Sequence, residues 1–133
     1  MPTAIRDELV TDASAAVRMI FGLAPGLRGA IAKNHSIAPS NFPIECANAL
    51  RKYVRANLLS PEQADSSLDD IMSLPITLVS APNLARVSLA TALELGLSAY
   101  DAAYVVVARG AGARLITADR RLAAAYPHAE LIA

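Results

Sequence analysis

Short apolar runs alternate with longer segments of helical periodicity along the whole chain. Five runs have the length and composition of strands, and they cover residues 9–11, 36–38, 76–79, 114–117 and 130–132. The intervening segments predict helices over residues 13–23, 27–33, 41–58, 61–73, 83–95, 99–110 and 119–125. Strands that alternate with helices predict the α/β class, with a parallel sheet covered on both faces.

Capping residues and breakers set the predicted helix boundaries. Ser60 and Pro61, with Gln63 three positions after the serine, are a strong helix start. Ser98 begins the helix over 99–110, although its segment 104–107 (Tyr-Val-Val-Val) has the intrinsic propensity of a strand. The serine cap and the Ala-rich flanks favour a helix there, and a helix is what we expect.

The helix predicted over 41–58 has two distinct faces. Its apolar residues recur at three-to-four spacing and predict one buried stripe: Cys46, Ala47, Leu50, Tyr53, Val54 and Leu58. Glu45, Asn48 and Lys52 fall on a neighbouring polar face. We therefore expect this helix to cover the sheet with one face and to present the polar face beside it.

Composition narrows the class of protein. A chain of 133 residues, 54% hydrophobic and 18% charged, is one domain on the usual size range and is not a disordered chain. We expect one domain over 1–133, with residues 1–8 as an N-terminal extension. The single cysteine, Cys46, excludes an internal disulfide framework and a Cys-rich zinc site. The chain shows neither a signal-peptide pattern nor an apolar stretch of roughly 18 residues, so we expect a cytoplasmic protein without a membrane span.

Four acidic residues carry the candidate chemistry. Asp12 and Asp119 each follow a short apolar run, Glu45 lies early in one predicted helix, and Asp101 lies in the first turn of another. The carboxyl ends of parallel strands and the adjoining helix starts meet at one edge of a sheet. Four carboxylates gathered there cannot all stay ionised without a cation, and oxygen ligands suit Mg²⁺ or Mn²⁺. The pattern predicts a metal-dependent phosphodiester hydrolase.

The charge balance agrees with a phosphate-bearing substrate. The formal net charge is zero, with twelve acidic residues against twelve Lys and Arg. Without the four acids of the predicted pocket, the rest of the chain has an excess of about four positive charges, which would attract phosphate to the surface around an acidic pocket.

Each acid also has a structural interpretation. Asp12 and Asp119 are suited to cap helices, Asp101 is placed to complete a capping box with Ser98, and Glu45 has the pattern of a solvated helical residue. Their common position at strand ends and helix starts favours a shared site. Nearby polar groups are placed to orient the carboxylates or water: Ser14 beside Asp12, Thr117 beside Asp119 and Asn48 beside Glu45.

The sequence gives little support to other kinds of catalytic or nucleotide-binding site. His35 and His128 are too few for a histidine-rich metal site, and no motif supports a nucleophilic pair of Cys46 and His35. The chain has no Walker loop and no G-x-G-x-x-G motif, and its six aromatics form no sequence-local stacking platform. Arg120 and Arg121 follow Asp119 and are placed either to touch phosphate or to remain solvated.

Four segments resemble motifs of the PIN domain family, and within it the VapC-type toxins of toxin–antitoxin pairs. They are residues 9–14, residues 38–39 with 45–50, residues 95–104 and residues 115–122. The resemblance covers residues 9–133. It implies a three-layer α/β/α fold with a five-stranded parallel sheet in the order 3-2-1-4-5.

The resemblance also implies a site and partners. Asp12, Glu45, Asp101 and Asp119 match the family's metal-binding acids, and Thr117 matches a hydroxyl commonly found beside the last of them. The family cleaves single-stranded or structured RNA with Mg²⁺ or Mn²⁺, and many members cut tRNA or rRNA. Its members usually form homodimers and are silenced by an antitoxin, here a cognate VapB-type protein.

Two other classes of function remain. One is a PIN-fold module that binds protein or RNA and has weak or no catalytic activity. The other is an unrelated phosphotransfer domain of the receiver type, which needs adjacent acids at the first strand and a late lysine. Asp12 stands between Thr11 and Ala13, and no lysine follows Lys52, so the sequence disfavours a receiver domain.

Overall fold

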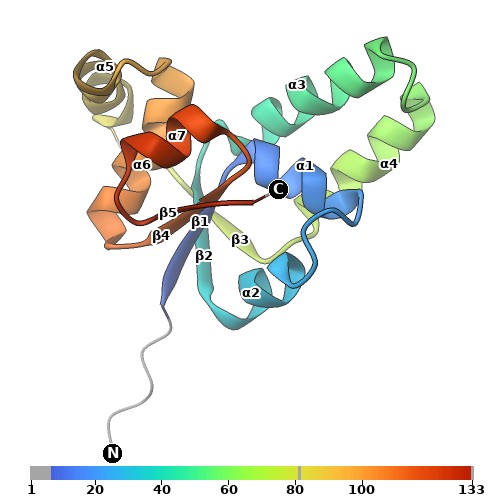
Figure 1. Ribbon diagram of the computed structural model, residues 1–133, viewed down its shortest axis with the longest axis horizontal. Coiled ribbons are helices and arrows are strands. Elements are labelled where there is room, and N and C mark those ends of the chain that lie inside the picture. Colours follow the sequence, from blue (N-terminus) through green and yellow to red (C-terminus); the bar gives the residue numbers. More distant parts are fainter. Residues whose placement is uncertain (1–6, 81, 133) are drawn as a thin grey trace, which may run out of the picture.

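The computed structural model describes residues 7–80 and 82–132 (Figure 1). Its strands are β1 Glu8–Thr11, β2 His35–Pro39, β3 Ile76–Val79, β4 Arg114–Thr117 and β5 Ala129–Leu131. Its helices are α1 Ala13–Ile20, α2 Leu27–Lys33, α3 Phe42–Arg55, α4 Pro61–Met72, α5 Leu84–Leu95, α6 Ala99–Ala111 and α7 Arg120–Ala125. Residues 1–6 of the predicted N-terminal extension lie outside the described residues, whereas Glu8 already belongs to β1.

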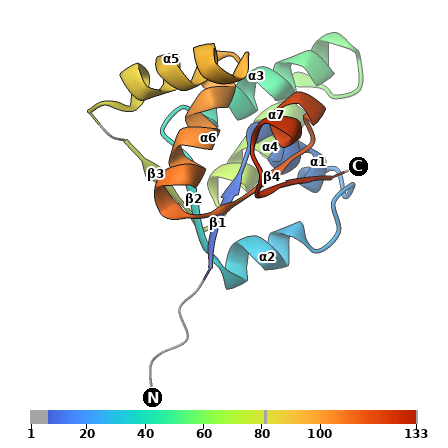
Figure 2. The same cartoon turned by 60° about the vertical axis from the view of Figure 1, so that its left-hand side comes forward.

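All five strands are parallel and lie in the order β3-β2-β1-β4-β5. Helices α1 to α4 cover one side of the sheet and α5 to α7 the other, as the two views show (Figures 1 and 2). The predicted three-layer fold and strand order 3-2-1-4-5 are therefore confirmed. Across the described residues, every helix is too short or too polar to traverse a lipid bilayer.

The central strands are buried on both faces. Leu9 and Val10 of β1 and Leu115 of β4 have no exposed surface. Their apolar side chains pack against helices above and below, as expected for a strand in the middle of a parallel sheet. In the register of the two strands, Val10 lies opposite Leu115 and Thr11 opposite Ile116, so β1 and β4 end side by side.

The segment with strand propensity is helical, as predicted. Helix α6 runs through Tyr104 and Val105, which are 1% and 0% exposed. The Ser98 hydroxyl caps its first turn, and Gly112 ends it in a left-handed conformation at φ +63°. Burial of this apolar stretch stabilises the helix more than the strand propensity of its valines opposes it.

The predicted helix over 41–58 ends earlier, at Arg55. Asn57 adopts a left-handed φ of +59°, and the Leu58 N–H donates to the Tyr53 carbonyl oxygen at 2.9 Å, which closes the helix. Leu58 is consequently 67% exposed, so its place in the predicted buried stripe was wrong. Likewise, the helix predicted over 13–23 ends at Ile20.

Candidate active site

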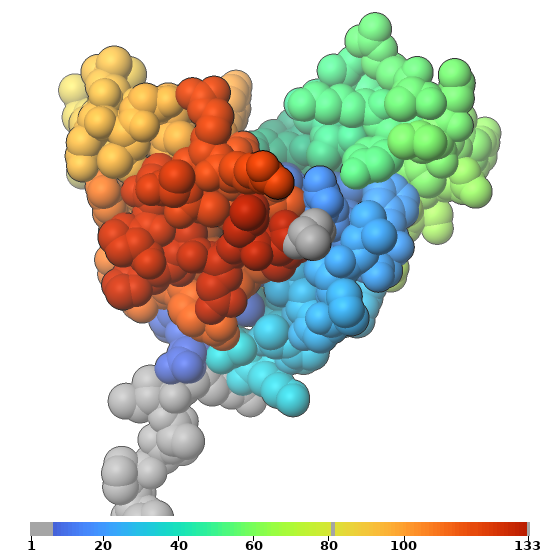
Figure 3. All heavy atoms as spheres, viewed as in Figure 1, coloured from blue at the N-terminus to red at the C-terminus, as the bar shows by residue number. Residues whose placement is uncertain are grey.

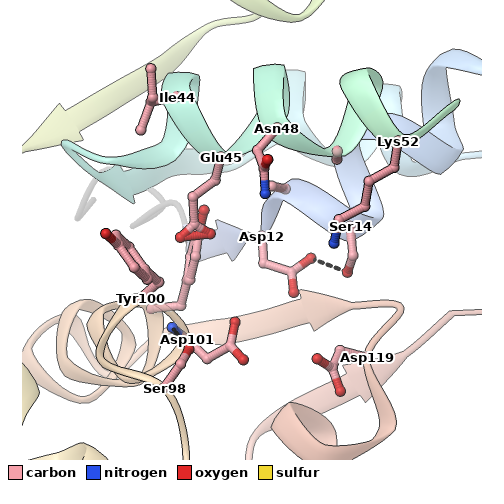
Figure 4. Close-up of a pocket in the computed structure, with 13 residues that line it drawn as sticks. Asp12, Ser14, Ile44, Glu45, Asn48, Lys52, Ser98, Tyr100, Asp101 and Asp119 are labelled. Atoms are coloured by element: carbon pink, nitrogen blue, oxygen red, sulfur yellow. Dashed lines mark hydrogen bonds between the residues drawn. The ribbon is translucent and has the colours of Figure 1, made fainter. Parts of the chain in front are cut away.

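The topology brings the four predicted acids to one edge of the sheet. Asp12 directly follows β1, and Asp119 follows β4 by two residues. Helices α3 and α6 start at this same edge, so their first turns place Glu45 and Asp101 there. All four line one pocket of about 600 Å³, which lies in the hollow between α3 and the α6–α7 side of the molecule (Figures 3 and 4). The lining is Asp12, Ala13, Ser14, Ile44, Glu45, Asn48, Ala49, Lys52, Ser98, Tyr100, Asp101, Tyr104 and Asp119.

Asp12 is the most buried of the four acids, with 4% of its surface exposed. Its Oδ1 accepts hydrogen bonds from the Ser14 hydroxyl at 2.7 Å and from the Ala15 N–H at 2.9 Å, which caps α1. Its Oδ2 accepts from the Thr117 hydroxyl at 2.5 Å. Asp12 therefore caps a helix and faces the pocket at once, and its three donors fix the orientation of the carboxylate.

Thr117 connects the first and last acids. Its hydroxyl donates to Asp12 and accepts the backbone N–H of Asp119 at 2.9 Å. The Ser14 hydroxyl likewise accepts the Ala118 N–H at 3.0 Å. Thr117 had been expected to support Asp119. In the structure it orients the Asp12 side chain, and it holds only the backbone of Asp119.

Asp119 is the N-cap of α7. Its Oδ1 accepts from the backbone N–H of Arg121 at 2.9 Å and of Leu122 at 3.4 Å. The carboxylate still points into the pocket beside Asp101 (Figure 4). The Arg121 guanidinium donates to the Gly96 carbonyl oxygen at 3.1 Å, so it holds α7 against the loop between α5 and α6.

Glu45 has a different partner from the one the sequence suggested. The Asn41 amide donates to its Oε1 at 2.8 Å, whereas Asn48 accepts from Arg51 Nε at 3.3 Å. Side chains on a helix lean toward its N-terminus, so Glu45 meets the residue one turn before it and not the residue one turn after. The structure therefore does not pair Asn48 with the Glu45 carboxylate, although Asn48 lines the same pocket.

Asp101 combines both of its predicted roles. Its backbone N–H donates to the Ser98 hydroxyl at 3.1 Å, which caps α6. Its carboxylate lies in the middle of the pocket, between Glu45 and Asp119 (Figure 4). The cap therefore uses the backbone of Asp101 and leaves its side chain available to the site.

Burial and mutual repulsion raise the pKa values of three of the pocket acids. Desolvation raises the pKa of Asp12, partly offset by its hydrogen bonds to Thr117, Ser14 and Ala15. Desolvation, with repulsion from Asp101 and Asp12, raises the pKa of Glu45 to about 7. Desolvation and the charge of Asp119 also raise the pKa of Asp101. A cation bound among these carboxylates would lower the free-energy cost of ionising them.

The donor set fits a hydrated divalent cation. It consists of carboxylate and hydroxyl oxygens, which Mg²⁺ and Mn²⁺ prefer, and Mg²⁺ keeps several waters when only one or two carboxylates bind it directly. Within residues 7–80 and 82–132, no three His, Cys, Asp or Glu side chains come close enough together to hold an ion by direct contact alone. The geometry therefore suits an ion bound partly through water.

Several lining residues are not assigned to the site by the sequence, among them Lys52, Tyr100 and Tyr104. Lys52 is the only basic residue of the lining, and Tyr100 stands at its rim with 64% of its surface exposed. The Tyr104 hydroxyl is buried and has no hydrogen-bond partner among the described residues. The sequence did place Lys52 on the same helix face as Glu45, but only the fold shows that this face forms a pocket wall.

Comparisons with known proteins agree with this geometry. The family model described as "PIN domain" matches residues 9–126. The chain is 32% identical to Ribonuclease VapC3 of Mycobacterium tuberculosis, over 98% of this chain and 96% of that protein. It is 36% identical to Ribonuclease VapC1 of the same organism, over 90% and 91% of the two chains. The crystal structure of PAE2754 from Pyrobaculum aerophilum superposes with a TM-score of 0.74 and 28% identity, over 96% and 91% of the two chains.

Proposed function

Because the chain belongs to the PIN domain family, in its VapC-type branch, we propose that it is a metal-dependent endoribonuclease toxin that hydrolyses RNA phosphodiester bonds. One observation carries the proposal: four carboxylates from four separate segments line a single pocket at the carboxyl edge of the sheet. Relatives over nearly the full length are named ribonucleases, which supports RNA as the substrate.

Each residue has a role in this proposal. Asp12, Asp101 and Asp119 hold the principal ion, Mg²⁺ or Mn²⁺, partly through bound water, and Glu45 completes its surroundings or positions water. Such an ion, when bound, supplies Lewis acidity and neutralises charge on the phosphate. Thr117 fixes the Asp12 carboxylate through its hydrogen bond.

The proposal includes partners. A toxin of this kind requires a silencing protein, and we assign that role to a cognate VapB-type antitoxin. We further propose that the protein acts in the cytoplasm as a homodimer, for which the long helices α3 and α4 offer candidate surfaces. The RNA substrate is a tRNA or rRNA in the same proposal.

Cleavage assays test this function directly. Purified protein is incubated with a panel of fluorescent RNAs and either Mg²⁺ or Mn²⁺, and an EDTA reaction serves as the metal control. Asp12→Asn and Asp119→Asn should abolish cleavage, whereas Asp65→Asn, an exposed acid on α4 outside the pocket, should cleave as the parent does. Equal cleavage by Asp12→Asn, Asp119→Asn and the parent would refute the assignment.

A binding module is the second candidate. It is favoured by the spacing of the acids, since no three of the described donors approach closely enough to share an ion by direct contact. In this case the protein would bind RNA or a partner through the same pocket and leave the RNA intact at every metal concentration tested.

A further inference from the structure

The pocket has two chemically different rims. Tyr100 and Ile44 stand at one end, and Lys52 stands at the other, beside Ser14 (Figure 4). Between them lie the carboxylates of Glu45, Asp12 and Asp101, as the same view shows. A ligand that crosses the carboxylates therefore meets an aromatic and aliphatic surface on one side and a single positive charge on the other.

The side chains of the apolar rim are largely exposed to solvent. Tyr100 is 64% exposed and Ile44 is 69% exposed. The other aromatic residues are buried or half-buried: Phe21, Phe42, Tyr53, Tyr104 and Tyr126. Tyr100 directly precedes Asp101 and Ile44 directly precedes Glu45, so each helix start turns an acid into the pocket and an apolar neighbour onto its rim.

Lys52 reaches the opposite rim because it lies on the same face of α3 as Glu45. Glu45, Asn48 and Lys52 follow one another at intervals of three and four residues, so they form a row along one face of the helix. Lys52 is exposed, and no ion pair to it occurs within the described part of the chain. Its ammonium group is therefore free to meet an anion that reaches the end of this row.

We propose that Tyr100 and Lys52 position the RNA strand in this pocket, with one nucleobase stacked on the Tyr100 ring and a phosphate held by Lys52 on the other side of the carboxylates. This inference rests on the proposed function, in that RNA is the ligand. Aromatic rings bind unpaired bases by stacking, irrespective of base identity. A base inside a duplex has both faces covered by its neighbours, so the Tyr100 rim selects against paired RNA.

Binding measurements test the two rims separately. A short fluorescein-labelled RNA is titrated by anisotropy with Mg²⁺ present, in an Asp119→Asn background that keeps the strand intact. Tyr100→Ala should weaken binding of the single strand roughly tenfold, and Tyr100→Phe should bind as the background protein does. Leu93→Ala removes another highly exposed apolar side chain, on α5 outside the pocket, and should leave binding unchanged.

The salt dependence of binding tests whether Lys52 contacts a phosphate. Lys52→Gln should reduce the slope of log affinity against log salt concentration by about 0.7, the amount expected for one phosphate contact on a single strand. Lys33→Gln is the matched control, since Lys33 is the other lysine and lies exposed at the end of α2, away from the pocket. Both rim residues are exposed, so equal melting temperatures should show that every variant folds.

Duplex RNA supplies the decisive comparison. The same labelled strand annealed to its complement should bind more weakly, and Tyr100→Ala should not weaken it further. Equal loss of affinity for single strand and duplex, or no loss for either, would overturn the inference, as would equal salt slopes for Lys52→Gln and Lys33→Gln. If binding depends on Tyr100 but the parent protein does not cleave RNA, the inference holds and the proposed function is refuted. If the parent protein cleaves RNA but binding does not depend on Tyr100, the proposed function holds and the inference is refuted.

Discussion

The Thr117 hydroxyl donates a hydrogen bond to Oδ2 of Asp12 at 2.5 Å, across a sequence separation of 105 residues. Both residues are buried, and they lie at the adjacent carboxyl ends of β4 and β1. The bond orients the most buried acid of the pocket, so we expect it to affect both folding and the site.

Replacement of Thr117 by valine keeps the shape of the side chain and removes its hydroxyl. A hydrogen bond to an ionised group contributes about 1.5–3 kcal/mol, so Thr117→Val should lower the free energy of unfolding by about that amount. Thr117→Ser keeps the hydroxyl donor, so its free energy of unfolding should fall by less. Urea unfolding at neutral pH measures both, and an unchanged midpoint for Thr117→Val would show that the bond contributes nothing to stability.

The pKa of Glu45 predicts a pH dependence of stability. Folding raises this pKa from 4.5 to about 7, so the folded state binds more protons and becomes less stable as the pH rises between these values. The penalty is absent below 4.5 and complete above 7. Because Glu45 is partly solvated, the difference that it causes should be about 1–2 kcal/mol.

Glu45→Gln isolates this contribution from those of Asp12 and Asp101, whose pKa values are also raised. The variant should lose less stability than the parent between pH 5 and pH 7.5, as measured by urea unfolding at both values. Parallel pH profiles for the two proteins would mean that Glu45 ionises as freely in the folded state as in the unfolded chain.

A divalent ion should stabilise the protein through the same pocket. At one hundred times its dissociation constant, a ligand that binds only the folded state adds about 2.7 kcal/mol, so Mg²⁺ or Mn²⁺ should raise the melting temperature. Asp12→Asn should abolish this increase, whereas Asp65→Asn on α4 should keep it. NaCl at matched ionic strength controls for screening, and an equal response of Asp12→Asn and Asp65→Asn would place the ion elsewhere.

Two buried tyrosines provide a matched pair. The Tyr104 hydroxyl has no hydrogen-bond partner among the described residues, whereas the Tyr126 hydroxyl donates to the Ala113 carbonyl oxygen at 2.7 Å. Tyr104→Phe should leave the free energy of unfolding unchanged or raise it, and Tyr126→Phe should lower it by about 1 kcal/mol. If calorimetry found that Tyr104→Phe was the more damaging substitution, the Tyr104 hydroxyl would have a partner in solution.

Much of the fold was predictable because the strong local signals agree with one another. The cap at Ser98 and the apolar content of 102–108 both favour one long helix, and α6 forms there. These patterns do not determine the strand order, because periodicity does not say which strands pair. The resemblance to a family is what implies the order.

The location of the site could be predicted from the sequence, whereas the contacts of its side chains could not. Strand ends and helix starts locate Asp12, Glu45, Asp101 and Asp119 at one edge of the sheet. The rest depends on side-chain direction and on the conformation of single residues. Glu45 leans toward Asn41, and the left-handed Asn57 ends α3 before Leu58 can become buried. Neither effect follows from apolar spacing.

The contact between the ends of β1 and β4 also determines when the pocket can form during synthesis of the chain. Asp12 is synthesised more than one hundred residues before Thr117 and Asp119. Until those two are made, the Asp12 carboxylate lacks its hydroxyl donor and the last of the other pocket acids. We therefore expect the pocket to be complete only after β4 and Asp119 have been synthesised, so a shorter nascent chain should not cleave RNA.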